Sequence, residues 1–306
     1  MNNACNGIIN VYKEKGFTSH DVVAKLRGIC KMKKIGHTGT LDPEAVGVLP
    51  VCFGSGTKLC DMLTDWDKEY IAVLRLGIVT DTQDMTGTIL KQCEADRISA
   101  LDEETVRNTI MGFLGDYDQI PPMYSALKVD GKKLYELARA GKEVDRMPRK
   151  VRIEEIEILS VELPLIKLRI VCSKGTYIRT LCHDIGTKLA CGGTMESLIR
   201  SRVGFFRIED ALTLAELEQL CDNNNISSVI VSPDTIFEGY RAATVNEQAL
   251  KMVQNGNALC PAQFTERIRF DGEDKVRVYG ADGRFYGIYI YRETERRLKP
   301  FKMFLT

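Results

Sequence analysis

Apolar and polar residues recur with two different periods along this chain. Short apolar runs typical of strands occupy residues 7–12, 47–53 and 69–77, and two more strands are expected within residues 151–172, interrupted around Pro164. Helical spacing predicts helices at residues 18–26, 57–64, 102–113, 134–141 and 177–190. Because strands and helices intermix without a regular βαβ repeat, the pattern predicts an α+β fold rather than a doubly wound α/β fold.

The last quarter of the chain has its own pattern. A short break at residues 231–234 contains a proline, and a helical segment follows at residues 246–254. Alternating segments at residues 276–280 and 284–291 then flank an Asp-Gly pair, which is a strong hairpin signal. Since 306 residues suggest about two domains, we predict one domain over residues 1–235 and a small, mainly β domain over residues 240–306.

Residues 116–150 differ from the segments around them. They contain two adjacent prolines, several tyrosines and a short helical pattern, and they end in a basic stretch. A long ordered loop within a domain is usually functional. We therefore predict that this segment leaves the core and contacts a partner.

Composition excludes several classes of protein. The hydrophobic fraction of 44% and the charged fraction of 27% are close to globular averages. No run approaches the roughly 18 to 20 apolar residues of a membrane span, and the N-terminus lacks the features of a secretory signal. The ten cysteines show no Cys-x-x-Cys spacing, so reduced thiols in a cytoplasmic protein are expected rather than disulfides or a metal site.

The charges balance overall but are segregated along the chain. There are 42 basic and 42 acidic residues, so the net charge does not indicate nucleic-acid binding. Basic residues nevertheless gather at residues 31–34, 146–152, 200–207 and 292–302, while acidic residues gather at 94–104 and 209–222. Such segregation can attract a polyanion to one face, although solvated surfaces explain the charges equally well.

The most informative segment is residues 36–43, which holds two glycines, a histidine and the dipeptide Asp42-Pro43. Proline restricts the residue before it to extended or turn conformations, and glycines permit backbone angles that other residues avoid. We expect a rigid loop that presents one carboxylate and one imidazole, with no neighbouring cluster of metal ligands. The chemistry would then be covalent or acid/base; the alternative is a structural turn in which Asp42 caps a helix.

Three further segments could complete a site with this loop. Residues 68–70 open a strand with Tyr70, residues 173–181 place Arg179 after a glycine turn, and residues 198–204 begin with Leu198. Taken singly, each has a structural explanation: a core aromatic residue, a surface arginine and a core leucine.

Together and in this order, the segments resemble the TruB family of tRNA pseudouridine synthases. The resemblance covers nearly the whole chain, from residues 13–19 through the loop at 36–43, the prolines and tyrosine of residues 121–126, and residues 198–204. It departs from the family pattern at Glu14, where proline is common, at Gly56, where alanine is usual, and at residues 193–194, where a Gly-Ala-His-like sequence is frequent.

The resemblance implies a pseudouridine synthase fold with a central mixed, largely antiparallel sheet, and an isomerisation of uridine that needs no cofactor and no metal. It assigns the essential carboxylate to Asp42, an ion-pair partner to Arg179, and a stacking or proton-transfer role to Tyr70. Burial would raise the pKa of Asp42, and a nearby guanidinium would counter that effect. Leu198 matches a residue that lines the pocket.

The resemblance also implies the substrate. The target would be uridine 55 in the T loop of tRNA, extruded from its stack to reach Asp42, with His37 occupying the vacated space. The segment at residues 116–150 would clamp the RNA, and the C-terminal domain resembles a PUA-type RNA-binding module. The protein would act as a monomer without a protein partner or a membrane. The residues expected to contact substrate or RNA are His37, Lys13, Gly39, Leu198, Tyr124, Lys128 and Arg202.

Two other functions remain open from the sequence. The chain could be an RNA-binding protein that assists tRNA folding, with catalysis incidental. It could also be a guide-dependent synthase acting on ribosomal RNA, although it lacks the long basic extensions of the eukaryotic relatives that work with guide RNAs.

Overall fold

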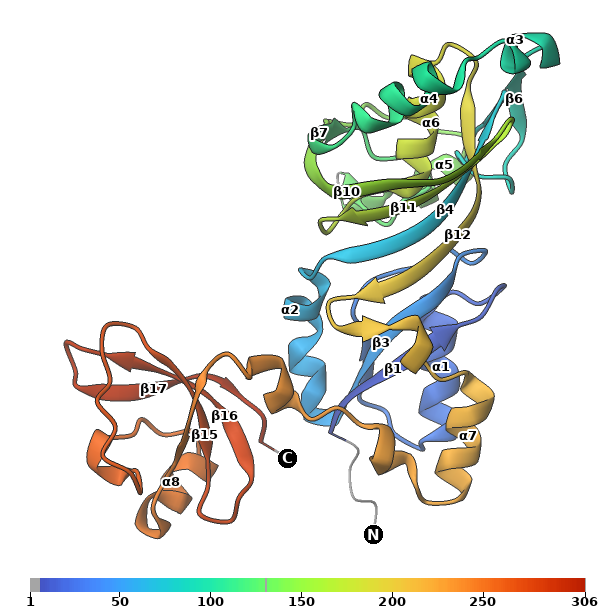
Figure 1. Cartoon of the computed structure of the whole chain (residues 1–306). Coiled ribbons are helices and arrows are strands. Elements are labelled where there is room, and N and C mark those ends of the chain that lie inside the picture. Colours follow the sequence, from blue (N-terminus) through green and yellow to red (C-terminus); the bar gives the residue numbers. More distant parts are fainter. Residues whose placement is uncertain (1–5, 130, 306) are drawn as a thin grey trace.

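The computed structural model describes residues 6–129 and 131–305, and its largest feature is a nine-stranded sheet (Figure 1). The strands of this sheet are β1 (Gly7–Lys13), β2 (Ile35–His37), β3 (Val46–Phe53), β4 (Lys68–Leu76), β7 (Gly115–Gln119), β10 (Arg149–Glu162), β11 (Leu165–Cys172), β12 (Gly193–Val203) and β13 (Phe206–Arg207). Their order is β1-β3-β12-β4-β11-β10-β7, with β2 paired to β3 and β13 paired to β12.

One pair of strands sets the topology of this sheet. β12 runs parallel to β3, where Ile199 faces Val46 and Arg200 faces Gly47, whereas every other pair in the sheet is antiparallel. The predicted α+β class, with a mixed and largely antiparallel sheet, is therefore confirmed. The parallel pair joins the N-terminal strands to the rest of the sheet and places β12 between β3 and β4.

Helices cover this sheet in two places. The α-helices are α1 (Ser19–Ile29), α2 (Cys60–Thr64), α3 (Ala95–Ser99), α4 (Glu103–Met111), α5 (Leu134–Arg139), α6 (Ile178–Lys188), α7 (Leu214–Asp222) and α8 (Leu250–Gln254). α4 and α6 bury their apolar faces against β4 and β11, and α1 and α7 bury theirs against β1 and β3 (Figure 1). The helices and the sheet thus form two adjacent hydrophobic clusters.

The start of α1 is fixed by a capping box. The Thr18 hydroxyl accepts a hydrogen bond from the Asp21 amide, and the Asp21 carboxylate accepts one from the Thr18 amide. This arrangement satisfies amides that the first helical turn leaves without partners. It also places Ser19, which is fully buried, beneath the loop that follows β2.

The segment predicted to leave the core is shorter than expected. β7 pairs with β10 from Gly115 to Gln119, so both ends of the predicted 116–150 excursion belong to the sheet. The sequence of β7 is polar because this edge strand exposes alternate residues. The sequence pattern therefore does not predict a strand here. The part that leaves the sheet contains α5 and a small hairpin of β8 (Lys128–Val129) and β9 (Lys132–Lys133).

A second sheet follows in the chain. It contains β14 (Arg241–Thr244), β15 (Lys275–Tyr279), β16 (Phe285–Arg292) and β17 (Arg297–Met303), in that order, and β15 and β16 form the predicted hairpin. The break expected at residues 231–234 is instead partly structured, because Val231 pairs with Ile8 and a 3-10 helix spans Pro233–Phe237. The domain limits at 235 and 240 remain a prediction.

Two expected helices are partly 3-10 in character, since Gly54–Leu59 precedes α2 and Glu247–Ala249 precedes α8. A short hairpin of β5 (Ile78–Thr80) and β6 (Ile89–Gln92) was not expected from the sequence. Within the described residues, no helix is long and apolar enough to cross a membrane. No disulfide joins any of the described cysteines.

Candidate active site

Asp42 lies in the loop between β2 and β3, and backbone hydrogen bonds hold this loop at several points. The Thr38 amide and hydroxyl both donate to the Pro50 carbonyl, at 3.2 and 3.1 Å. The Leu41 amide donates to the buried Ser19 hydroxyl at 2.9 Å, and the Ala45 amide donates to the Asp42 carbonyl at 3.1 Å. These hydrogen bonds tie the loop to β3 and to the start of α1; its rigidity remains a prediction.

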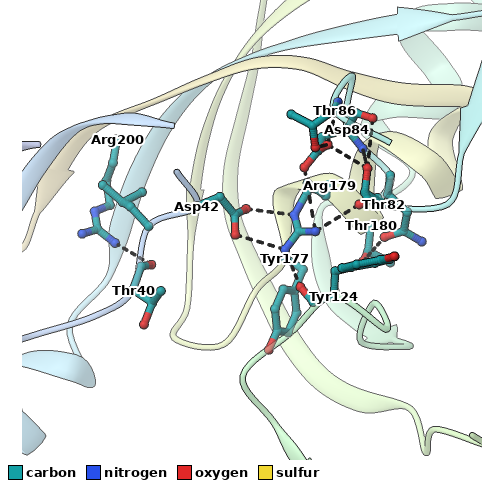
Figure 2. Close-up of polar contacts among 12 residues, drawn as sticks. Thr40, Asp42, Thr82, Asp84, Thr86, Tyr124, Tyr177, Arg179, Thr180 and Arg200 are labelled. Atoms are coloured by element: carbon teal, nitrogen blue, oxygen red, sulfur yellow. Dashed lines mark hydrogen bonds and ion pairs between the residues drawn. The ribbon is translucent and has the colours of Figure 1, made fainter. Parts of the chain in front are cut away.

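Arg179 binds the Asp42 carboxylate with two nitrogen atoms (Figure 2). Its Nε lies 2.9 Å from Oδ2, and its Nη2 donates to Oδ1 at 3.2 Å. The Arg179 side chain is only 5% exposed, whereas that of Asp42 is 36% exposed and open to a ligand. Such two-point binding fixes both the position and the orientation of the carboxylate.

The rest of the Arg179 guanidinium is held by backbone. Nη1 donates to the Thr82 carbonyl at 3.0 Å and Nη2 donates to the Tyr124 carbonyl at 2.9 Å. A second carboxylate, Asp84, lies 3.9 Å from Nη1. Arg179 thus ties three separate segments together: the Asp42 loop, the turn after β5, and the segment after β7 (Figure 2).

The electrostatics of Asp42 oppose its ionisation. Burial raises the pKa of the Asp42 carboxyl, and the negative charge of Asp84 raises this pKa further, while Arg179 lowers it without fully offsetting the increase. The sequence-based expectation of opposed effects on this pKa is thus met, with burial as the larger effect. A carboxylate held in this way is more basic than one in water.

Lys13 departs from its predicted role as an RNA-binding residue. It is fully buried, and its ammonium donates to the carbonyls of Phe17, Pro43 and Glu14 at 2.6, 3.0 and 3.1 Å. Burial lowers the pKa of Lys13 to about 8, against the opposing charge of Asp42. All three hydrogen bonds of its ammonium go to backbone carbonyls of the protein itself. Lys13 therefore supports the loop beside Asp42 instead of contacting RNA.

His37 lies at the end of β2, where the chain enters the loop. Its Nδ1 accepts a hydrogen bond from the Gly39 amide at 3.3 Å, and its ring meets that of His20 edge to face with 5.1 Å between centroids. Burial lowers the pKa of His37 to about 4, with His20 and Arg200 as smaller causes. The imidazole is therefore neutral at neutral pH.

Tyr70 and Leu198 meet in the hydrophobic cluster that also contains Leu41, the residue before Asp42. Tyr70 lies in β4 and Leu198 in β12, each only 8% exposed. Burial raises the pKa of the Tyr70 hydroxyl, and the nearby Arg200 opposes that rise. The phenol is therefore neutral at neutral pH and can donate a proton or a hydrogen bond.

The remaining predicted residues lie at different distances from this centre. Tyr124 contributes its backbone carbonyl to Arg179, and Gly39 contributes its carbonyl to Arg200 at 3.2 Å. Lys128 is exposed in β8. Arg202 donates to the Gly204 carbonyl at 3.0 Å, and neither Lys128 nor Arg202 forms a hydrogen bond or ion pair with Asp42 in the described parts of the chain.

Three residues near Asp42 were missed. Tyr177 directly precedes α6, its backbone exchanges hydrogen bonds with the Gln119 side chain, and its ring lies below Arg179 (Figure 2). The signal for Tyr177 was its place two residues before Arg179. Asp84 and Arg200 gave no comparable signal, because one lies in an irregular turn and the other was only part of a basic cluster. Among described residues, no group of three His, Cys, Asp or Glu side chains could hold a metal.

Comparison with known proteins identifies the family of this chain. Residues 27–178 match the model of the TruB family pseudouridylate synthase N-terminal domain, and residues 179–238 match that of the tRNA pseudouridylate synthase B C-terminal domain. The tRNA pseudouridine synthase B of Lachnoclostridium phytofermentans is 53% identical over 98% of this chain and 100% of its own length. That of Clostridium tetani is 44% identical over 92% of this chain and 94% of its own length.

Solved structures with the same fold are more distant in sequence. A chain from the crystal structure of a Cbf5-Nop10-Gar1 complex is 25% identical, with a TM-score of 0.70 over 98% of this chain and 85% of that one. A chain from an H/ACA RNP bound to a substrate RNA containing 2'-deoxyuridine, at 23% identity and a TM-score of 0.70, covers 99% of this chain and 86% of that chain and shows the fold alone. The family models and the full-length relatives together decide the family, and this chain belongs to the TruB family of pseudouridylate synthases.

Proposed function

We propose that this protein converts uridine 55 in the T loop of tRNA to pseudouridine, with Asp42 as the essential carboxylate. The observation that carries the proposal is the partly exposed Asp42 carboxylate bound at two points by the buried Arg179. The substrate class is supported by relatives of nearly full length, which are named tRNA pseudouridine synthase B.

The reaction is an isomerisation in which atoms balance without a second reactant. The bond between ribose C1' and uracil N1 breaks, the base rotates, and C1' bonds to C5. The proton on C5 is lost, and N1 gains one. An ionised Asp42 can attack the sugar, attack the base, or remove a sugar proton to give a glycal, and all three routes require the charge that Arg179 stabilises.

The other residues of the site would bind and orient the base. A uridine in a folded loop must leave its stack to reach Asp42, and the neutral His37 at the loop entrance would occupy the space left behind. The ring of Tyr70 would stack on the base while its protonated hydroxyl serves proton transfer. Tyr177 offers a second aromatic ring beside Arg179. Contacts to tRNA from the α5 segment and the small sheet belong to the proposal, as does action without a protein partner.

The test is to incubate the purified chain with unmodified tRNA and to map pseudouridine by position. Asp42→Asn should lower the rate on the order of 10⁴-fold, because the essential carboxylate is lost, while tRNA affinity changes little. Asp222→Asn, at the exposed end of α7, makes the same charge change and should behave as wild type. Retained turnover by Asp42→Asn would refute the catalytic role, and modification at another position would refute the proposed target.

The same experiment separates the two alternative functions. Rescue of misfolded tRNA by the inactive Asp42→Asn variant would favour a folding role. Activity on an isolated, unmodified T-arm hairpin without other proteins would exclude dependence on a guide RNA.

A further inference from the structure

Arg200 is a buried cation beside the Asp42 loop, and neither the reaction nor the ion pair described above uses it. It lies in β12, is 1% exposed, and is the largest fully buried side chain among the described residues. In the sheet it faces Gly47 of β3 on one side and Tyr70 of β4 on the other. Its place is therefore at the junction of the parallel strand pair with the strand that carries Tyr70.

The guanidinium of Arg200 binds backbone on both sides of the Asp42 loop. Nε donates to the Val48 carbonyl at 2.7 Å, in the strand after the loop. Nη2 donates to the Gly39 carbonyl at 3.2 Å and Nη1 to the Thr40 carbonyl at 3.5 Å, both before Asp42. Figure 2 shows Arg200 reaching Thr40 from one side of the loop while Arg179 reaches Asp42 from the other.

The charge of Arg200 is compensated by these carbonyl dipoles. Among the described residues, no carboxylate lies within ion-pair distance of its guanidinium. Its charge is felt nearby, since it contributes to the lowered pKa of Lys13, His37 and Lys68 and opposes the rise in the pKa of Tyr70. Burying a cation in this way costs free energy that an apolar side chain of similar volume would not. Stability alone therefore does not account for an arginine at this position.

We propose that Arg200 is a positioning residue for Asp42: it fixes the backbone of the loop at Gly39 and Thr40 so that the carboxylate meets the substrate in the reactive geometry. The inference rests on the proposed function, because it concerns the same carboxylate. The planar guanidinium is required, because its three nitrogens are spread apart and reach Val48 on one side of the loop and Gly39 and Thr40 on the other. An ammonium on a lysine side chain donates from one atom and does not reproduce this spread of donors.

The test uses Arg200→Lys, which keeps the charge, and Arg200→Met, which keeps the bulk. In single-turnover reactions with saturating enzyme, we expect the rate constant for pseudouridine formation to fall roughly 10- to 100-fold, because a small displacement of a reacting group has effects of this size. The dissociation constant for tRNA, measured by filter binding, should change less than about threefold. The matched control is Arg169→Gln, another arginine of the same sheet, whose partners Glu69, Glu155 and Glu157 lie in neighbouring strands.

Hydrogen exchange gives a readout that does not depend on turnover. The amides of Thr38, Leu41 and Ala45 are hydrogen-bonded within or beneath the loop, so they should exchange faster in both Arg200 variants, while amides of α4 and α6 keep their wild-type rates. Faster exchange throughout the chain would indicate general destabilisation and would overturn the inference.

Three further results would overturn it. The first is a rate constant within twofold of wild type in both Arg200→Lys and Arg200→Met. The second is a loss of tRNA affinity without a loss in the rate constant. The third is hydrogen exchange of the loop amides at the wild-type rate. A wild-type product at a position other than 55 would revise the proposed target while the rate comparison still decides the role of Arg200. If wild type makes no pseudouridine, the proposed function fails, and exchange in the loop alone decides whether Arg200 fixes it.

Discussion

One guanidinium serves two carboxylates at the centre of the site. Arg179 lies 2.9 Å from Asp42 and 3.9 Å from Asp84, and it is almost completely buried. Asp84 is itself fixed by the hydroxyl of Thr82, at 2.8 Å, and by the amide of Thr86, at 3.0 Å. The charge of this second carboxylate raises the pKa of Asp42 and so makes Asp42 harder to ionise.

This arrangement predicts the pH dependence of the reaction. The proposed reaction needs an ionised Asp42, so the rate should fall as the pH drops through the raised pKa of Asp42, which lies above the ordinary aspartate value. Asp84→Asn removes the negative charge that contributes to this rise. The acid limb of the pH–rate profile should therefore move to lower pH in single-turnover assays.

The control for this prediction is Asp222→Asn, which changes the net charge equally at the exposed end of α7. Its profile should match that of wild type. An acid limb of Asp84→Asn that stays in place or moves to higher pH would show that Asp84 does not set the ionisation of Asp42.

The sequence predicts only part of the site. Asp42 and Arg179 are 137 positions apart, and no periodicity links them; their pairing was expected only from the resemblance to a family. Lys13 differs from its predicted role because a lysine near a proposed RNA site is ordinarily solvated, whereas here three backbone carbonyls replace water. Asp84 raises the pKa of Asp42 through its charge. The spacing of the two residues in the sequence does not reveal that they lie near the same arginine.

At the level of elements, the approach of β12 to β3 depends on a glycine. Gly47 has φ of +108°, and a Cβ at this position would lie 2.3 Å from the Arg200 carbonyl oxygen and 3.0 Å from its carbonyl carbon. Both atoms belong to backbone and cannot turn away. The residue that faces Arg200 in the parallel pair must therefore lack a side chain.

Gly47→Ala should consequently separate these two strands. We expect the free energy of unfolding to fall by at least about 3 kcal/mol, because the substitution combines a strained backbone angle with a clash against backbone. Denaturant unfolding measures the change. Gly28→Ala in α1, where a Cβ would meet nothing within 4 Å, should stay within about 1 kcal/mol of wild type or gain stability. Similar stability of the two variants would contradict this account of the strand pair.

The elements found from the sequence are those with regular periods. β1, β3, β4 and the β15–β16 hairpin follow apolar alternation or buried runs and were predicted nearly to their ends. β12 was not assigned as a strand, because its buried Arg200 and two irregularities in its pairing with β4 interrupt the pattern. The sequence pattern does not predict β7, because it is a polar edge strand. Tertiary contacts decide both cases, and they are invisible to local patterning.

Across the whole molecule, the two sheets share a hydrophobic cluster even though Figure 1 shows them side by side as separate units. Ile288 and Phe304 of the C-terminal part pack in one cluster with Ile8 of β1, Leu59 of the 3-10 helix before α2, and Leu63 of α2. The Lys58 ammonium also donates to the Met303 carbonyl at 2.8 Å. We infer that the two sheets unfold together, because neither can leave without exposing this cluster to water.

Phe304→Ala tests this coupling. Phe304 is 5% exposed, and its ring lies 5.3 Å from that of Phe285 and 6.1 Å from that of Phe237. Its truncation should lower the free energy of unfolding by about 3 kcal/mol and split a single denaturant transition into two. Phe301→Ala in β17, where the ring is 51% exposed, should change stability by less than about 1 kcal/mol and keep one transition. A single transition in Phe304→Ala, with stability equal to that of Phe301→Ala, would mean that the cluster does not couple the two sheets. The small sheet would then be free to move independently of the Asp42 site.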